Sequence, residues 1–259
     1  MRRLLALHAW AAIAFLWLPM VAVALLSFSE SRYGLRLEGF TLRWYANLAA
    51  DARLAEYLRN TLVVALASTA LATALGTLLA LALARQRFRL RAALEGLLYL
   101  PLVVPDVVLG IALLILFTLL REWLGGPQLS LLTVTLGHTA FQLSYVTLVV
   151  RARLSLLDPA LEEAARDLGA TPWQAFAHVT LPLLAPGIGA GALLALSLSL
   201  DDFVITFFTA GSGSTTLPLY LYSSLKLGVR PEIHALSTLL MGSTILALLI
   251  GYLHARKRP

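Results

Sequence analysis

The sequence predicts an all-α, polytopic membrane protein with six transmembrane helices, and three observations support this prediction. First, 59% of the 259 residues are hydrophobic and only 13% are charged, whereas soluble domains carry about 25% charged residues. Second, several nearly uncharged stretches reach the roughly 20 apolar residues that cross a bilayer. Third, the mean hydropathy of the chain is +0.82, which indicates that its surroundings are mostly lipid. The sequence also holds no cysteine, which excludes disulfide scaffolds, thiolate catalysis and cysteine metal sites.

The predicted spans follow the apolar stretches in order. They lie within a single transmembrane domain over 1–259, at about 4–29, 60–84, 94–120, 130–151, 183–209 and 233–254. The first stretch follows Arg2-Arg3 and could be a cleaved signal peptide. Its apolar run is longer than the roughly 7–15 residues of a signal peptide's hydrophobic region, so we expect it to be retained as a span.

Basic residues predict the orientation, because cytoplasmic loops of membrane proteins carry an excess of Lys and Arg. With six spans, both termini lie on one side of the membrane. The two ends and the loops after the second and fourth spans carry twelve basic residues, against eight on the opposite side. We therefore predict that both termini are cytoplasmic. Next to a span, the run Arg85, Arg87, Arg89 and Arg91 indicates orientation and contact with anionic lipid, and we expect no nucleic-acid partner.

The predicted cytoplasmic loop at 152–182 contains strong helix signals. Asp158-Pro159 suits a helix start, and Gly169 can end that helix with a positive φ. Thr171 and Gln174 fit a capping box for a second helix, which we expect Leu181-Pro182 to stop. Two short rigid helices suit docking to another protein; a plain connector between spans is the alternative.

The spacing of this loop also resembles a known family. Glu163-Ala164-Ala165, three residues, Gly169, nine residues, Val179, one residue and Leu181-Pro182 resemble the EAA motif of the permease subunits of ABC importers. Only Val179 departs from the family pattern, which has isoleucine there. The resemblance implies a type I ABC-importer permease fold in a bacterial inner membrane. It implies that the motif docks on a cytoplasmic ABC ATPase dimer, that a second permease chain completes the pore as a heterodimer, and that an extracytoplasmic binding protein delivers the substrate.

The chain supplies no ATPase motif of its own. A phosphate-binding loop needs glycines followed by a lysine, and the glycine-containing segment 211–216 has no lysine. We therefore expect no cofactor on this chain and no enzymatic activity, with ATP and Mg²⁺ bound by the partner ATPase.

Three carboxylates fall inside predicted spans, where such charges are costly and indicate function. Asp106 follows Pro101 and Pro105, which we expect to kink or open the third span; the alternative role for Asp106 is to cap the resumed helix. Asp201 and Asp202 are adjacent, so on a helix their side chains point about 100° apart and cannot share one narrow stripe. Carboxylates here would attract cations. The alternative is that the fifth span ends at Asp201.

A second resemblance concerns the substrate. The segments 197–204 and 40–45 are similar to the second permease subunit of spermidine/putrescine importers. This resemblance implies that Trp44, Asp106 and Asp201 or Asp202 line the substrate pathway, where carboxylates and an aromatic ring would bind a polyammonium chain. Subunits of this type for ferric iron, thiamine or an oxyanion remain alternatives, as do a proton-coupled secondary transporter and an intramembrane enzyme.

Two further patterns predict helix contacts. His138 and Gln142 lie one turn apart and could bond across helices, which we favour over a metal site. Gly187, Gly189 and Gly191 include the GxxxG spacing, which permits close helix packing.

Overall fold

In the computed structural model, the residues described are 1–31, 36–86, 89–226, 228 and 230–255, and every regular element among them is a helix. Arg32, Arg87 and the basic cluster at 256–258, which contribute to the orientation prediction, lie outside the described residues. The chain divides into two compact units, 1–55 with 221–259 and 56–220, and the divisions fall within α3 and α11.

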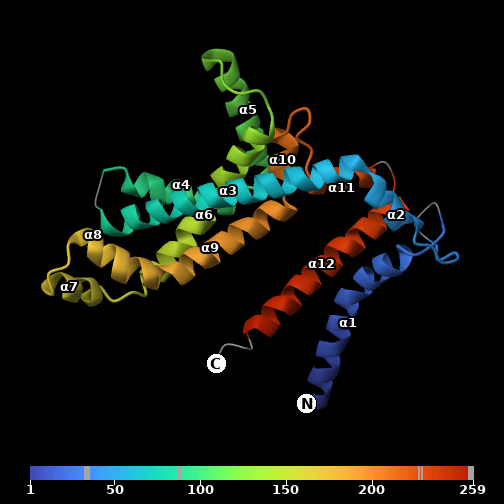
Figure 1. Ribbon diagram of the computed structural model, residues 1–259, viewed down its shortest axis with the longest axis horizontal. Helices are drawn as coiled ribbons and strands as arrows, with labels where there is room; N and C mark the ends of the chain where they lie inside the picture. Colours follow the sequence, from blue (N-terminus) through green and yellow to red (C-terminus); the bar gives the residue numbers. More distant parts are fainter. Residues whose placement is uncertain (32–35, 87–88, 227, 229, 256–259) are drawn as a thin grey trace. The chain divides into compact units, whose positions relative to one another are not determined.

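The first unit is built around two long helices. Its complete helices are α1 (Arg2–Leu26), α2 (Arg43–Ala50) and α12 (Pro231–Ala255), and α12 packs against α1 and α2 (Figure 1). α1 buries none of its residues. A helix that is apolar all round and has no buried face is suited to lipid contact.

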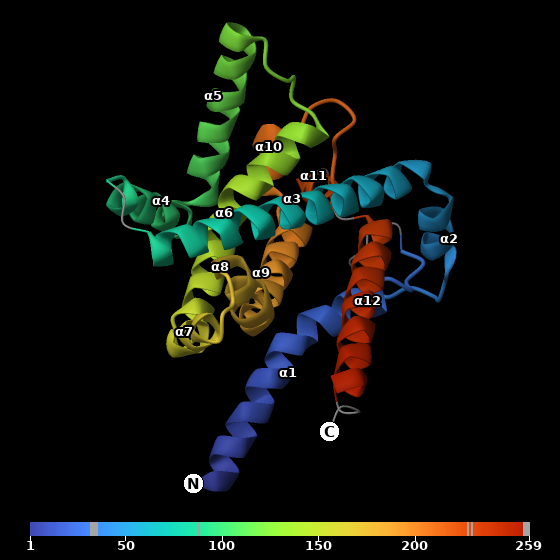
Figure 2. The same cartoon turned by 60° about the vertical axis from the view of Figure 1, so that its left-hand side comes forward.

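The second unit carries the features that indicate function. Its helices are α3 (Ala52–Arg85), α4 (Arg91–Val103), α5 (Asp106–Leu124), α6 (Leu131–Leu154), α7 (Ala160–Asp167), α8 (Pro172–Ala175), a π-helix η1 (Phe176–Thr180), α9 (Leu181–Asp201), α10 (Val204–Thr209) and the start of α11 (Leu217–Lys226). α6 lies at its centre and packs against α4, α9 and α10 (Figure 2).

Four helices of the described residues are long and apolar enough to cross a membrane: Arg2–Leu26, Ala52–Arg85, Asp106–Leu124 and Pro172–Asp201. α6, at the fourth predicted span, has 24 residues, of which twelve are buried. Many of the buried ones are polar, so this helix faces protein more than lipid. α12, at the sixth predicted span, has 25 residues.

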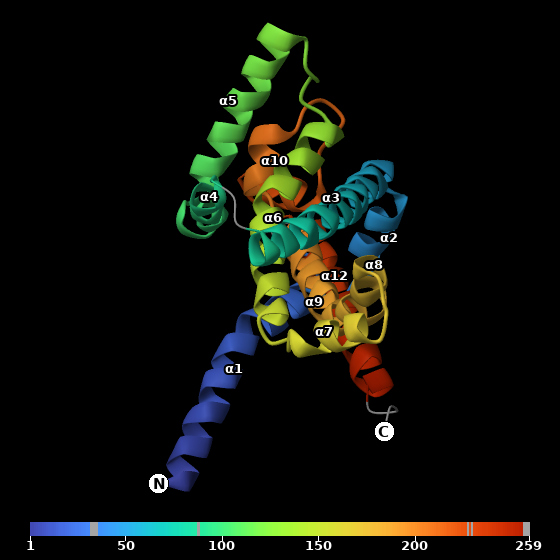
Figure 3. The same cartoon turned by 90° about the vertical axis from the view of Figure 1, so that its left-hand side faces the viewer.

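The third predicted span is divided into two helices. Pro101 remains inside α4, whereas Pro105 precedes α5, and Val104 between them is extended with φ −77° and ψ 131°. A residue before proline is biased toward this conformation, so Pro105 causes the break. Figure 3 shows α4 and α5 meeting at a bend. The opening that the two prolines predict is therefore present, and Asp106 is the first residue of the resumed helix.

The fifth predicted span differs from expectation at both ends. The helix that the capping box of Thr171 and Gln174 begins does not stop at Leu181-Pro182, but runs on through η1 into α9. Proline normally clashes with the carbonyl four residues earlier, and here that carbonyl lies in the wider turn of the π-helix. At the other end, α9 stops at Asp201, Asp202 is extended, and α10 begins at Val204. The predicted span 183–209 is therefore not one continuous helix, because Val204–Thr209 form the separate helix α10.

Small residues bring α9 close to α6. A Cβ atom on Gly187 would lie 2.5 Å from the Cβ of Arg153, and one on Gly191 would lie 3.3 Å from Val146 Cγ1. Arg153 also donates from Nε to the carbonyl of Leu183 at 3.1 Å. The predicted glycine contact is thus confirmed as a contact with α6. Gly189, between them, faces open space.

Gly187 and Gly189 provide a matched test of this packing. We expect Gly187→Ala to lower the free energy of unfolding by about 1–3 kcal/mol, because the added methyl group overlaps Arg153. Gly189→Ala should be neutral or stabilising by about 0.5–1 kcal/mol, because alanine favours the helix. Thermal unfolding of the purified chain in detergent measures both. Equal midpoints for the two variants would contradict this packing.

Candidate functional site

The two helix breaks meet at one cavity. It has a volume of about 240 Å³, and its lining includes all three predicted carboxylates, Asp106, Asp201 and Asp202, with Phe141 and Tyr145 from α6. α10, which follows the second break, packs against α5, which follows the first. Backbone that leaves the helix at membrane depth is tolerated where it lines a cavity. The structure therefore brings together three of the four residues predicted to line the pathway.

Asp202 is engaged inside the protein. Its carboxylate accepts hydrogen bonds from the backbone N–H groups of Ile205 at 3.3 Å and Thr206 at 3.0 Å, at the start of α10. It also lies 3.1 Å from Nε2 of His138, and its side chain is only 10% exposed. Asp202 thus stabilises the second break by binding the first turn of α10.

His138 connects α6 to the helices around it. Its Nδ1 lies 2.7 Å from Ser199 Oγ on α9, and its Nε2 lies 2.9 Å from Thr206 Oγ1 on α10. The hydroxyl of Ser199 lies in turn 3.3 Å from that of Ser68 on α3. The prediction of a polar packing contact is confirmed for His138. The Gln142 amide, also buried, has no hydrogen-bond partner among the described residues.

Asp106 and Asp201 behave differently from Asp202. Both are exposed, and among the described residues neither takes part in an ion pair. Asp106 is the first residue of α5, whose N-cap residue is Pro105, and its side chain has no hydrogen-bond partner among the described residues. The cavity therefore presents two carboxylates that remain available to a ligand, beside the aromatic rings of Phe141 and Tyr145.

Trp44 lies in the first unit and is used there for packing. Its side chain is 5% exposed, its indole N–H donates to the carbonyl of Ser29 at 2.7 Å, and the guanidinium of Arg43 lies 4.3 Å from the ring centroid. A place for Trp44 on the substrate pathway stays a prediction.

The predicted docking loop presents a mixed surface. Gly169 has the expected positive φ of 93°, and Glu163, Ala164, Gly169, Leu181 and Pro182 are exposed, whereas Ala165 and Val179 are half-buried. Leu168 and Trp173 were not predicted as site residues, and their exposed fractions are 90% and 71%. Both side chains are therefore accessible to a partner at this loop. Leu168 directly precedes Gly169, and this position was the signal available in the sequence.

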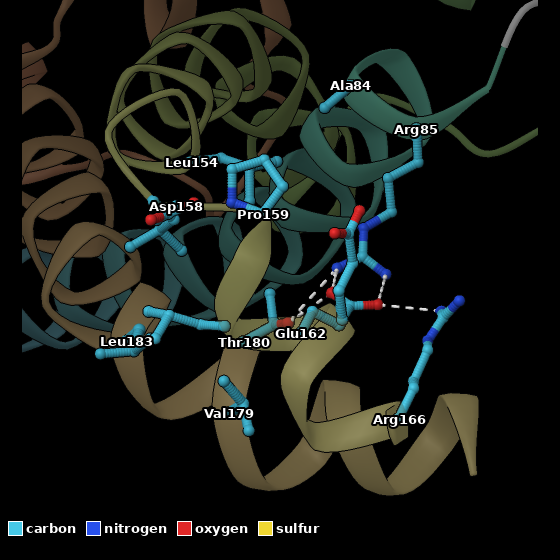
Figure 4. A pocket seen from close by; sticks show the side chains of 13 residues that line it. Ala84, Arg85, Leu154, Asp158, Pro159, Glu162, Arg166, Val179, Thr180 and Leu183 are labelled. Carbon is cyan, nitrogen blue, oxygen red and sulfur yellow. Dashed lines mark hydrogen bonds and ion pairs between the residues drawn. The ribbon is translucent and has the colours of Figure 1, made fainter. Parts of the chain in front are cut away.

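Glu162 and Glu163 are adjacent but have different surroundings. Figure 4 shows Glu162 between Arg85, Arg166 and Thr180 at a cavity of about 420 Å³. It forms ion pairs with both arginines and accepts a hydrogen bond from Thr180 Oγ1 at 2.7 Å. Among the described residues Glu163 has no ion pair, although it lines the same cavity. The inward role of Glu162 was not predicted.

The contacts of Glu162 favour its charged form. The hydrogen bond from Thr180, and then the positive charge of Arg85, hold the pKa of Glu162 below its usual value despite partial burial. A carboxyl group with a lowered pKa stabilises the folded state above its unfolded pKa, and this contribution is lost as the pH falls through the folded pKa. The attachment of α7 by Glu162 is therefore intact at neutral pH and is lost in acid, as the pH falls through the lowered pKa of Glu162.

A helical membrane permease has the features found here: long apolar helices, a carboxylate-lined cavity at interrupted helices, and an exposed loop with the spacing of the EAA motif. The chain belongs to the family of binding-protein-dependent transport system inner membrane components, whose family model matches residues 56–259.

Its relatives are transport permeases. The chain is 42% identical over 245 residues to the putrescine transport system permease protein PotI of Escherichia coli, covering 93% of this chain and 87% of that protein. It is 37% identical to the spermidine/putrescine transport system permease protein PotC of Escherichia coli, covering 95% and 91%. Membership of this family excludes two alternatives that the sequence left open, a proton-coupled secondary transporter and an intramembrane enzyme.

Solved structures agree on the fold. A bacterial ABC transporter involved in the import of the acidic polysaccharide alginate has a TM-score of 0.75 over 100% of this chain and 98% of that chain, at 18% identity. The same kind of transporter, in complex with an alginate pentasaccharide-bound periplasmic protein, also has a TM-score of 0.75, at 20% identity. The fold is therefore like that of type I ABC-importer permeases.

The different surroundings of Asp201 and Asp202 predict different effects on stability. Asp202→Asn should lower the free energy of unfolding by about 1–3 kcal/mol, because a buried charge-assisted acceptor of several hydrogen bonds is lost. Asp201→Asn, the matched control, should leave the unfolding midpoint unchanged. Thermal unfolding in detergent compares them, and an Asp202→Asn protein as stable as the wild type would contradict the capping role.

Proposed function

We propose that this chain is a permease subunit of a binding-protein-dependent ABC importer for polyamines. The single observation that carries the substrate class is the cavity at the two helix breaks, where Asp106 and Asp201 are exposed and unpaired among the described residues. A polyamine carries several ammonium groups, and carboxylates bind ammonium by charge-assisted hydrogen bonds. The names of PotI and PotC support the same substrate class.

The assembly follows from the same proposal. A second permease chain completes the pathway as a heterodimer, an extracytoplasmic binding protein delivers the substrate, and a cytoplasmic ABC ATPase dimer binds the loop that contains Glu163 and Gly169. ATP and Mg²⁺ are bound by the ATPase, and this chain binds no cofactor. The exposed Leu168 and Trp173 support a protein partner at this loop.

In the membrane, the chain crosses six times and has both ends in the cytoplasm. The crossings are α1, α3, α4 with α5, α6, α9 with α10, and α12. At 1.5 Å per residue, the 24 residues of α6 and the 25 of α12 are long enough for a hydrocarbon core of about 30 Å. The buried polar residues of α6 would face the bundle interior, as polar groups in membrane helices generally do.

The substrate class is tested by reconstituting the complete importer in liposomes. Uptake of labelled putrescine, spermidine and thiamine is measured with and without the binding protein and ATP. We expect ATP-dependent, binding-protein-dependent uptake of a polyamine. Uptake of thiamine or an oxyanion with no polyamine uptake would overturn the substrate class and leave the permease class intact.

Neutralising the available carboxylates should weaken polyamine transport. Asp106→Asn and Asp201→Asn keep the side-chain size but remove the charge. A hydrogen bond to a charged group is worth about 1.5–3 kcal/mol, so each should raise the substrate concentration for half-maximal uptake by about 10- to 150-fold. Glu122→Gln, at an exposed carboxylate near the end of α5 and away from this cavity, is the matched control. Unchanged uptake in both cavity variants would exclude this cavity from the pathway.

Reversing the charge of Glu163 should weaken ATPase attachment. Glu163 lies in the first turn of α7, where a positive charge opposes the helix dipole at a local cost of about 0.3–1 kcal/mol and also alters the docking surface. We expect Glu163→Lys to recover less ATPase in a pull-down and to import less substrate, while Glu122→Lys behaves as wild type. Wild-type recovery and uptake with Glu163→Lys would show that Glu163 lies outside the contact.

A further inference from the structure

We propose that Glu162 is a positioning residue that joins the docking helix α7 rigidly to the cytoplasmic ends of α3 and α9, so that a movement of α7 is passed to both. This inference rests on the proposed function, since it takes the loop to be the ATPase contact. Glu162 precedes the EAA motif and has contacts of a different kind from those of Glu163.

The contacts of Glu162 reach three elements. Arg85, the last residue of α3, donates to the carboxylate of Glu162 from both terminal nitrogens. Thr180, the last residue of η1 and directly before α9, donates to it at 2.7 Å. Arg166, one turn along α7, donates to it at 3.0 Å. One side chain of α7 therefore binds the end of one long helix and the beginning of another (Figure 4).

The partners of Glu162 are themselves held in place. Thr180 is 5% exposed, and Arg85 also approaches its hydroxyl at 3.4 Å and lies 5.6 Å from the ring centroid of Phe176 in η1. The Glu162 side chain is 19% exposed. An isolated ion pair at the surface contributes little, but several charges in a fixed network contribute more. The carboxylate of Glu162, shared by Arg85, Arg166 and Thr180, therefore holds α7 more firmly than an isolated surface ion pair would. We call this cluster of four side chains the joint.

Glu162 is bound at the π-helix η1, where the continuous helix that runs from α8 into α9 departs from regular α-helical geometry. A π-helical turn is a local departure from regular α-helix and often marks a functional position. η1 lies between α8, in the docking loop, and α9, whose other end carries Asp201 at the cavity. Thr180 is the residue at which η1 becomes α9, so Glu162 is bound to the one irregular turn between the loop and the cavity helix.

Glu162 and Glu163 of α7 line the same cavity but differ in their partners. Glu162 directs its charge to residues of the same chain, whereas Glu163 has no ion pair among the described residues. A loss at Glu163 should reduce contact with the ATPase. Loss of the negative charge at Glu162 should leave the ATPase contact in place. It should reduce how far a movement of α7 is passed on to α3 and α9.

The test compares Glu162→Gln with Glu163→Gln in the complete importer. Both variants neutralise a carboxylate of α7, and they differ in whether it has internal partners. For Glu162→Gln we expect ATPase recovery within about twofold of wild type and about a tenfold or greater fall in substrate imported per ATP hydrolysed. For Glu163→Gln we expect reduced recovery and an unchanged ratio in the complexes that remain.

A distance measurement reports the joint directly. The chain has no cysteine, so Ala84→Cys at the end of α3 and Ala160→Cys at the start of α7 accept one spin label each, in a complex whose partner subunits carry no reactive cysteine. The wild-type distance distribution should be narrow and keep its width when ATP binds. Glu162→Gln should broaden it, and Glu163→Gln should not, which a general loss of stability in both variants would not produce.

The outcomes are decisive. A wild-type import ratio together with a wild-type distance distribution in Glu162→Gln would overturn the proposal. If Glu162→Gln fails to assemble, Thr180→Val and Arg85→Gln decide: a broadened distance and a lowered ratio support the joint, and wild-type values in both overturn it. Failure of the proposed function is distinguishable, because the wild-type complex would then recover no ATPase or import no polyamine, while the label distance would still report the joint.

Discussion

Backbone hydrogen bonding in hydrocarbon is the constraint on which the rest of this structure depends. Each N–H and C=O group must find a partner inside the protein, so spanning segments are helices and interruptions are tolerated only at protected or cavity-lining positions. The second unit contains two such interruptions, at Val104 and at Asp202 and Phe203. Both meet at one cavity. The breaks therefore place Asp106 and Asp201 at helix ends that line this cavity.

The second break is stabilised by a polar network rather than by apolar packing alone. Asp202 binds the first turn of α10, and His138 holds Asp202, Ser199 and Thr206 from the central helix α6. Engaging one of two adjacent carboxylates in this way leaves Asp201 to face the cavity. One of two neighbouring carboxylates is thus engaged within the protein while the other has no ion pair among the described residues, and the same holds for Glu162 and Glu163 in the loop.

Local chemistry could be predicted from the sequence, but contacts between distant segments could not. The capping box of Thr171 and Gln174, the positive φ of Gly169 and the break near Pro105 depend on neighbouring residues alone, and all are present. The continuous helix through Pro182 was missed because η1 relieves a clash that a regular helix would have. Which of Asp201 and Asp202 is engaged depends on His138, 63 or more residues away along the chain. The role of Glu162 likewise depends on Arg85, which lies far away in the sequence, at the end of α3.

We propose that Asp106 and Asp201 together bind a polyamine on its way through this chain. The most direct measurement is putrescine uptake by the reconstituted importer in which both residues are replaced by Asn, with the binding protein and ATPase unchanged. ATPase recovery and putrescine binding by the isolated binding protein should equal those of the wild type, so any loss arises in the permease. We expect uptake to fall far below that of either single variant. Uptake with the wild-type rate and concentration dependence would contradict it.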